Sequence, residues 1–515
     1  MRLAGWPIAV RGLILLLLLA GAALAFRPEA SVFATPLTED SYYSLAVARS
    51  VAAGIGVTVD GIQPTNGFQP LFTFIEAGAY WLTGGNEAGA VRIVLGISAL
   101  IWASTAFLLG AIAADAAPDT PAERTTRRWL AIALYLSGFL TFMHHFNGLE
   151  TGCLMLVYAA CWRVYQSGIW QRQWGPAVMG ALLGILVLTR IDAAIFVALF
   201  CAVLGLLELR QGFWRAVYRV GLCGVVALAI SSPWWIYNYL EFGRLMPTSG
   251  TAQQAWAVEG RRLRWIFWAL GVASMPQLWL GKLDEMFGDG IALSILRAVL
   301  GLTLLGFFVK AAKARGLFSP RDETSRRTLT FAGILAGALL VLCLYYGFSF
   351  IAYWFYYRYL FPTVLLATVG LAWLAAPYAA RASGKAVAVL ALLALPTLIS
   401  AAMAQSGRTL HVDTVYWQQI ELIDKYVGKE EPVAAGQTGT LGYFRKATVN
   451  VDGKVNRAAI PYQQNMWEYL KANNVRWFCD WPNYVEKYLG PDPGVHGWKL
   501  HADLGFWRLW KYEGS

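Results

Sequence analysis

The sequence predicts a polytopic α-helical membrane protein of about eleven transmembrane helices, followed by a C-terminal α/β domain outside the membrane. Of the 515 residues, 57% are hydrophobic and only 14% are charged, whereas an average soluble domain is roughly 45–50% apolar and about 25% charged. The charge is also unevenly placed, because 25 of the 73 charged residues lie in the last 111 positions. The composition therefore divides the chain into a membrane body, residues 1–404, and a soluble domain, residues 405–515.

Eleven apolar stretches approach the length of about 20 residues that a helix needs to cross a bilayer. They lie at 8–26, 90–113, 129–146, 149–166, 176–190, 193–208, 219–238, 291–309, 328–350, 359–376 and 386–404. The first stretch resembles a signal peptide, but it is long enough to cross and more spans follow, so we interpret it as a retained anchor. The apolar segment 68–82 is short and contains Glu76, and it is expected to lie in the membrane interface.

The basic residues predict the orientation of the spans, because cytoplasmic loops are enriched in Lys and Arg. With 68–82 in the interface, one side of the membrane receives the basic clusters at 124–128, 163–172, 210–219, 310–327 and 381–385. The N-terminus is then cytoplasmic, and the C-terminal domain is extracytoplasmic, or periplasmic, together with two large loops at 27–89 and 239–290. The net charge of +11 is thus an orientation signal, and the expected partners are membrane lipids and no nucleic acid.

Two adjacent carboxylates, Glu39 and Asp40, follow the first span. Either could act as a base that removes a proton from a hydroxyl group, although Thr38 or Asp40 could instead cap the helix expected at 44–53. Further along the same loop, Asn66 and Gln69 could bind hydroxyl groups through their amides. The alternative is that the Asn66-Gly67 pair and the nearby prolines only form rigid turns.

Several ionisable residues lie at the expected outer ends of helices, where burying a charge is costly and a function is the default interpretation. His144, His145 and Glu150 form one group, but their spacing is not that of a standard metal site. Arg190 and Asp192 form another. Arg358 follows a run of aromatic residues that includes Tyr357, and its guanidinium group is well suited to holding a phosphate.

These segments together resemble the GT-C glycosyltransferase superfamily, which consists of multispanning enzymes that use polyprenyl-phosphate sugars. The nearest subgroups are the mycobacterial-type arabinofuranosyltransferases and related mannosyltransferase-like proteins. The resemblance covers nearly the whole chain and rests on the order of its motifs. They are Glu39-Asp40, Thr65 to Leu71, Asn147 to Thr151, Arg190-Ile191-Asp192, Pro233 to Asn238, Arg358 to Pro362, Gly442-Tyr443-Phe444 and Asn450 to Asn456. Relatives often have Asp-Asp or Asp-Glu at the Glu39-Asp40 position, and a His and a Trp at Gln69 and Phe72, so the donor sugar is not carried over.

The resemblance implies an inverting transfer of a sugar from a polyprenyl-phosphate-linked donor to a hydroxyl of a glycan, lipid or protein acceptor. Asp40 is the expected base, with Glu39 as the second choice. The donor phosphate is assigned to Arg358, with Arg190, His144, His145 and Tyr357 as helpers, and acceptor or sugar binding is assigned to Tyr43, Asn66, Gln69 and Glu150. No cofactor and no metal is expected.

Two other classes of protein compete with this interpretation. A lipid flippase or transporter could use the same basic residues without chemistry, but the two halves of the chain show no matched pair of Gly- or Pro-broken helices. A structural or sensory membrane protein would make no use of ionisable groups gathered at the outer helix ends.

Overall fold

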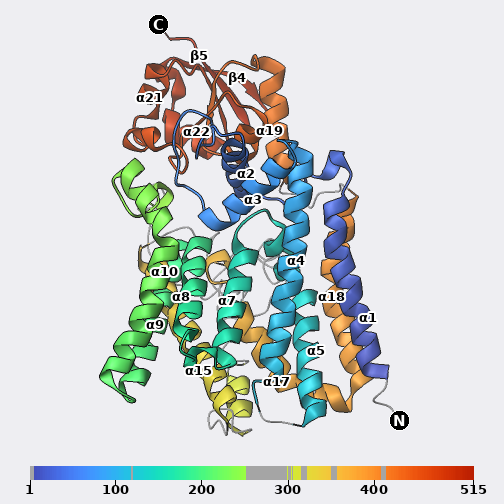
Figure 1. Cartoon of the computed structure of the whole chain (residues 1–515). Helices are drawn as coiled ribbons and strands as arrows, with labels where there is room; N and C mark the ends of the chain where they lie inside the picture. Colours follow the sequence, from blue (N-terminus) through green and yellow to red (C-terminus); the bar gives the residue numbers. More distant parts are fainter. Residues whose placement is uncertain are drawn as a thin grey trace.

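The computed structural model describes residues 5–117, 120–250, 299, 303, 306–314, 322–349, 357–406 and 413–514. A bundle of helices running side by side carries a small sheet domain at one end, and the N-terminus lies at the other end (Figure 1). The helices of the bundle are α1 (Gly5–Ala23), α4 (Glu87–Ala114), α5 (Pro121–Ser137), α6 (Phe139–Phe146), α7 (Thr151–Gln166), α8 (Gly175–Thr189), α9 (Ala194–Leu209), α10 (Phe213–Phe242), α15 (Glu323–Ser349), α17 (Thr363–Arg381) and α18 (Ser383–Gln405).

Within the described residues, seven helices are long and apolar enough to cross a membrane, or eight if the bent pair α5 and α6 forms one span. The chain is therefore an integral multi-pass membrane protein, as predicted, but the count of eleven spans is not confirmed. The helices α7 and α8 have only 16 and 15 residues, fewer than the about 20 of a full span. The expected span 291–309, and residues 251–290 of the second loop, lie almost entirely outside the described residues.

The expected span 129–146 is broken rather than straight. The axes of α5 and α6 differ by 64°, and Gly138 between them has φ −69° and ψ 114°, which interrupts the helical hydrogen bonds. The hydroxyl of Thr141 compensates by donating to the carbonyl oxygens of Tyr135 (2.5 Å) and Gly138 (2.6 Å). The break turns α6 away from the line of α5, and a local cause of this kind accounts for most sharp helix bends.

Apolar side chains on the outside of the bundle are available to lipid. On α1, Leu15, Leu16 and Leu19 are 57%, 50% and 59% exposed, and Val225 and Leu228 of α10 are exposed as well. A soluble monomer rarely exposes so much contiguous apolar surface. The membrane therefore covers these faces.

The predicted cytoplasmic loops meet at one end of the bundle. Asp115 accepts from Arg124 and from Arg163 (2.7 Å), and the side chain of Gln166 donates to Thr328 (2.8 Å). These contacts join three segments at the end of the bundle that lies away from the sheet domain (Figure 1). The segments are the connection from α4 to α5, the last turn of α7 and the first turns of α15. Which side of the membrane this end faces stays a prediction.

Two helices of the first outer loop, α2 (Glu39–Ala52) and α3 (Pro70–Leu82), lie between the bundle and the sheet domain (Figure 1). The 13 residues of α3 rise about 20 Å at 1.5 Å per residue, less than the roughly 30 Å of a bilayer core. It is too short to cross, in keeping with the interface position expected for 68–82.

The C-terminal part of the chain is an α/β domain, as predicted. Its five strands are β1 (Val433–Ala435), β2 (Thr448–Asn450), β3 (Trp477–Asp480), β4 (Trp498–Asp503) and β5 (Arg508–Tyr512), in the order β2-β1-β3-β5-β4. The strands β2, β1 and β3 are parallel, and β5 is antiparallel to β3 and β4. The helices are α19 (Asp413–Tyr426), α20 (Gly439–Phe444), α21 (Met466–Ala472) and α22 (Pro482–Leu489).

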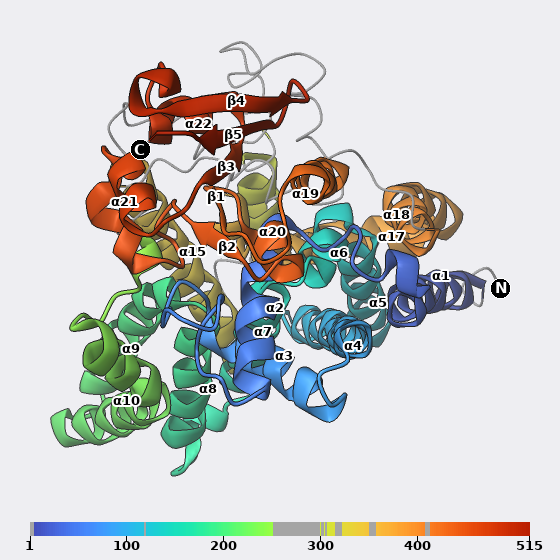
Figure 2. The ribbon, with the colours of Figure 1, turned by 90° about the horizontal axis from the view of Figure 1, so that it is seen from above.

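Both faces of the sheet are covered at its central strands β1 and β3, whereas most of β4 is exposed. Ala434 and Phe478 belong to one apolar cluster, whereas Val433, Trp477 and Cys479 belong to another, as the alternation of side chains along a strand requires. The carboxyl ends of β1 and β2 face α2, which lies beside α20 when the molecule is seen from above (Figure 2). The fold thus places the start of the first outer loop against the edge of the sheet.

Candidate active site

Asp40 and Arg358 lie in contact, although 318 residues separate them in the sequence. Oδ2 of Asp40 is 3.3 Å from Nη1 of Arg358, and the two side chains are 26% and 15% exposed. Thr38 occupies the cap position of α2 without a side-chain capping bond, and its hydroxyl donates to the carbonyl of Asn147 (3.4 Å). The structure therefore joins the predicted base to the predicted phosphate-binding cation.

Arg190 is held by two carboxylates in a buried group. It donates to both oxygens of Asp192 (3.0 and 2.6 Å) and to Oε1 of Glu150 (2.9 Å), and Tyr346 also donates to Asp192 (2.7 Å). Buried charges need such pairing to offset their lost hydration. Glu150 and Asp192 therefore share the charge of Arg190, and because Glu150 lies in this ion pair, the structure does not leave it facing an acceptor.

The ring of Tyr359 connects the two arginines. Its centroid is 4.5 Å from the guanidinium carbon of Arg190 and 5.7 Å from that of Arg358, within the range of cation–π attraction. Arg190 thus has two carboxylates within 3.0 Å, whereas the ion pair of Arg358 with Asp40 is longer, at 3.3 Å. That Arg358 holds a phosphate stays a prediction.

The two adjacent histidines have different surroundings. His145 is engaged by the protein, since Nδ1 is 2.7 Å from the carbonyl oxygen of Thr141 and Nε2 is 3.5 Å from the hydroxyl of Tyr135. His144 packs against Phe361 and Tyr357, with ring centroids 4.4 and 5.4 Å apart. Its buried Nε2 has no hydrogen-bond partner among the described residues. His144 thus packs against Tyr357, which precedes Arg358 in the chain, whereas His145 is built into the fold. Phosphate binding by these residues stays a prediction.

Glu39 faces away from Arg358 and anchors the outer domain. Its carboxylate accepts from the backbone nitrogens of Gly439 (2.5 Å) and Thr440 (2.9 Å) and from the hydroxyl of Thr440. Tyr43, one turn later, accepts from the nitrogen of Thr438 (3.0 Å) and lies 3.1 Å from its hydroxyl. Because protein donors occupy both side chains, the structure supports neither Glu39 as a second base nor Tyr43 as an acceptor ligand.

Burial raises the pKa of Glu39 to about 7, although the hydrogen bonds from Thr440 and Gly439 favour the ionised form. A carboxyl whose pKa is higher in the folded than in the unfolded state stabilises the fold at pH values below the unfolded pKa, which is 4.5 for Glu39. This stabilisation is lost as the pH rises through the folded pKa of about 7. The full change corresponds to about 3 kcal/mol. We therefore expect the stability of the outer domain to fall between about pH 4.5 and pH 7, as followed by tryptophan fluorescence during denaturant unfolding.

Glu39→Gln is expected to flatten this pH dependence, because a neutral amide replaces the titrating carboxyl. Burial also raises the pKa of Asp480 to about 7, so part of the slope persists in the variant and the difference from wild type isolates Glu39. An identical slope in both proteins would contradict the assignment.

Asn66 and Gln69 occupy different surroundings. Asn66 is fully buried, donates to Asn238 (2.9 Å) and accepts from the nitrogen (2.9 Å) and hydroxyl (2.7 Å) of Thr248. Its amide therefore ties the first loop to α10 and to the segment after it, and is already occupied by protein partners. Gln69 caps α3 by position, and its Oε1 accepts from the nitrogen of Ile191 (3.4 Å), beside Arg190. A Cβ atom at Gly67 would collide with the carbonyl oxygen of Lys454, which explains the glycine after Asn66.

Two titratable residues near the site escaped the sequence assignments. Glu76 of α3 is fully buried and accepts from Ser44, and burial raises its pKa well above the ordinary value. Lys454 lies 3.1 Å from Asp452, and, although burial opposes it, the carboxylates of Asp452 and Asp40 raise its pKa. A lone Glu in an apolar helix was a visible signal for Glu76, and Lys454 lies within the Asn450 to Asn456 motif, which was noted without a role for this residue.

Within the ranges that the structure describes, no three His, Cys, Asp or Glu side chains form a group that could hold a metal ion. Independence from a metal or cofactor stays a prediction.

No family model and no curated protein matches the chain, but its fold has clear counterparts among solved structures. ArnT from Cupriavidus metallidurans, in a crystal structure bound to undecaprenyl phosphate and in another in the apo state, superposes with a TM-score of 0.58 at 13% identity, over 99% of this chain and 98% of that one. The archaeal oligosaccharyltransferase AglB from Archaeoglobus fulgidus gives a lower TM-score of 0.48 at 12% identity, over 97% of this chain and 74% of that one. The chain thus shares the fold of ArnT, which confirms the predicted class of polytopic helical membrane protein with a C-terminal sheet domain.

Proposed function

We propose that the protein is an inverting glycosyltransferase that moves a sugar from a polyprenyl-phosphate donor to an acceptor hydroxyl on the outer side of the membrane. The observation that carries this proposal is the contact between Asp40 and Arg358 at 3.3 Å, beside the outer domain. It gains support from the shared fold with ArnT, which was crystallised with undecaprenyl phosphate.

The chemistry follows from the charges of this pair. Asp40 removes the acceptor proton as the hydroxyl oxygen bonds to the anomeric carbon, and the bond from that carbon to the phosphate oxygen breaks. The phosphate gains negative charge as it leaves, so Arg358 stabilises the transition state more than the ground state. A phosphate that draws Arg358 toward itself also releases Asp40 from its ion pair, which makes the carboxylate a stronger base.

The surrounding residues have supporting roles. Arg190, Glu150 and Asp192 hold Tyr359 against Arg358. The buried Nε2 of His144, which no described residue engages, is suited to a second hydrogen bond with the phosphate. The end of the bundle that contains Asp115, Arg124 and Arg163 is assigned to the cytoplasm, because basic loops are retained there.

The experiment is to supply the full-length protein in lipid nanodiscs with a panel of polyprenyl-phosphate sugars and to measure free polyprenyl phosphate by mass spectrometry. A glycosyltransferase releases polyprenyl phosphate when it transfers the sugar to an acceptor or, slowly, to water. A flippase moves the lipid between leaflets of a proteoliposome and leaves it intact. If the protein translocates intact donor and no free polyprenyl phosphate is formed, the proposed function is wrong and the protein is a transporter.

A further inference from the structure

The loop that follows β2 packs against the first outer loop. It covers residues 451–456, between β2 and the turn that begins at Arg457. The carbonyl oxygen of Lys454 lies so close to the backbone of Gly67 that a Cβ atom at Gly67 would be 2.0 Å from it, and only a glycine permits such an approach. The outer domain therefore meets the first outer loop at Lys454 as well as at Glu39.

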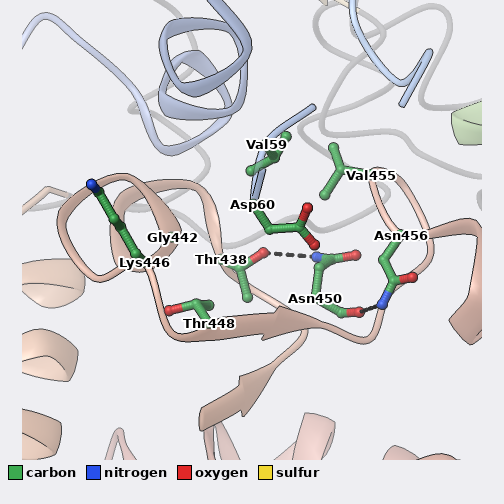
Figure 3. A pocket seen from close by; sticks show the side chains of 9 residues that line it. All are labelled: Val59, Asp60, Thr438, Gly442, Lys446, Thr448, Asn450, Val455 and Asn456. Atoms are coloured by element: carbon green, nitrogen blue, oxygen red, sulfur yellow. Dashed lines mark hydrogen bonds between the residues drawn. The ribbon is translucent and has the colours of Figure 1, made fainter. Parts of the chain in front are cut away.

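Hydrogen bonds fix the position of this loop relative to α2. The hydroxyl of Tyr43 accepts from the nitrogen of Thr438 (3.0 Å), and the hydroxyl of Thr438 accepts from the amide of Asn450 (2.8 Å). The side-chain oxygen of Asn450 accepts in turn from the nitrogen of Gly453 (3.2 Å). At the other end of the loop, Asn456 donates to the carbonyl oxygen of Asn450 (2.8 Å), and Figure 3 shows both of these side chains together with Thr438. The loop thus has a fixed place beside the helix that contains the proposed base.

The ammonium group of Lys454 interacts with the carboxylates of Asp452 and Asp40. Its Nζ is 3.1 Å from Oδ2 of Asp452, and the side chains of Lys454 and Asp452 are 19% and 1% exposed. Burial lowers the pKa of Lys454, but the two carboxylates outweigh burial and raise the pKa above the ordinary value. Lys454 is therefore a permanent cation within electrostatic range of Asp40.

Two cations of different kinds thus act on Asp40. Arg358 belongs to the membrane body and forms the direct ion pair at 3.3 Å. Lys454 belongs to the outer domain and acts through space, because its own ion pair is with Asp452. A ligand that takes Arg358 away leaves the second cation in place.

Other titratable groups surround the two residues. Besides Arg358 and Asp452, the groups that interact with Asp40 or Lys454 by charge are Glu39, Tyr357, Tyr416, Tyr484 and Lys487. The tyrosines are neutral below about pH 9, whereas burial shifts the pKa of Glu39, Lys487 and the nearby Asp480 to about 7. Because all of these groups remain when Lys454 is replaced, a difference from wild type isolates the lysine.

A bound donor removes the nearer cation. Its phosphate draws Arg358 toward itself and its sugar covers Asp40 from water, and a carboxylate that loses a counter-charge and its hydration takes up a proton more readily. A protonated Asp40 cannot act as a base. We propose that Lys454 is a positioning residue that keeps Asp40 ionised while the donor is bound and leaves its oxygens open to the acceptor hydroxyl. This inference rests on the proposed function, because Lys454 acts through Asp40.

The test uses two variants with opposite expected effects. Lys454→Met removes the cation, whereas Asp452→Asn removes the counter-charge of that cation and keeps the oxygen that accepts from the nitrogen of Lys454 (2.8 Å). Lys454→Arg keeps the charge. The matched control is Lys499→Met, which removes an exposed lysine of the same domain that pairs with Glu513 at 3.5 Å. For the full-length proteins in lipid nanodiscs, kcat at saturating donor and the unfolding temperature are measured from about pH 4 to about pH 9, the range in which carboxyl and imidazole groups titrate.

The acid limb of the pH profile, in which kcat rises as the base ionises, should move up by about one pH unit in Lys454→Met. This is the low end of the effect of a nearby opposite charge on a carboxyl group. On that limb kcat should be about tenfold below wild type, and at alkaline pH the two rates should converge. Asp452→Asn should move the limb to lower pH, because the ammonium charge is no longer offset. Lys454→Arg and Lys499→Met should keep the wild-type limb.

A loss of kcat by the same factor at every pH would overturn the proposal, because such a loss comes from a displaced outer domain. An unshifted limb in both Lys454→Met and Asp452→Asn would also overturn it, and Asp452→Asn alone decides if Lys454→Met does not fold. Infrared difference spectra, in which each protein is compared with its own Asp40→Asn version, titrate the Asp40 carboxyl with polyprenyl phosphate bound and without turnover. The expected shift in these spectra with no sugar transfer by wild type would contradict the proposed function and still support the effect of Lys454 on Asp40.

Discussion

Asp40→Asn is expected to lower the rate of sugar transfer by about 10²- to 10⁴-fold, the usual contribution of a positioned base. The amide fills the same space but cannot take a proton. It also removes the charge that holds Arg358 at 3.3 Å, so the donor should bind at least as well as in wild type. The measurement is the rate of glycosylated product formation at saturating donor, together with the donor KM.

The matched control for this variant is the neighbouring carboxylate. Glu39→Gln also replaces a carboxyl group by an amide in the first turn of α2, but Glu39 faces Gly439 and Thr440. It should therefore retain most of the transfer rate below pH 7, where the wild-type carboxyl is itself largely protonated. If Asp40→Asn turns over at the wild-type rate, Asp40 is not the base. If both variants lose the same rate, the loss comes from a shift of α2 against the outer domain and not from a missing base.

Arg358→Ala is expected to lower kcat/KM for the donor by the equivalent of about 2 kcal/mol, the lower end of the cost of truncating one partner of a buried charge pair, because this site is partly exposed. The loss should be seen in both KM and kcat, because the guanidinium binds the phosphate and stabilises it as it leaves. Arg358→Lys should recover part of the loss, since an ammonium group keeps the charge but not the paired hydrogen bonds.

A suitable control is Arg326→Ala, which removes an exposed arginine paired with Glu323 on α15. It should leave donor kinetics unchanged. If Arg358→Ala also leaves them unchanged, Arg358 serves only as an interface anchor, and the phosphate must be held elsewhere.

The sequence was sufficient to single out Asp40 and Arg358 as functional candidates, because charges at outer helix ends are costly, but it did not predict that the two side chains contact each other. It was not sufficient to divide the roles of Glu39 and Asp40. Successive residues of a helix point about 100° apart, since one turn takes 3.6 residues, and which of the two carboxylates faces Arg358 depends on how α2 is rotated. Contacts with Gly439 and Thr440, about 400 residues away, fix that rotation.

Two further misassignments have similar causes. Asn66 was open to a sugar-binding role, but its partners Asn238 and Thr248 come from a distant part of the chain that no local pattern identifies. The break at Gly138 was hidden by continuous hydrophobicity, since the composition on both sides suits a single span. By contrast, the division into a membrane body and a soluble C-terminal domain, and most of the helices, were predictable from charge density and apolar length alone, which do not depend on long-range contacts.

The first turn of α2 contains the proposed base on one side and the anchor of the outer domain on the other. Any exchange of outer domains between proteins of this fold would therefore have to transplant α2 as well, because a foreign domain without a match for Glu39 would leave Asp40 at the wrong rotation. A chimera that joins this membrane body to another outer domain should be inactive until its first loop comes from the same parent as that domain. The boundary that matters for engineering then lies within the first loop, far from the end of the last membrane helix.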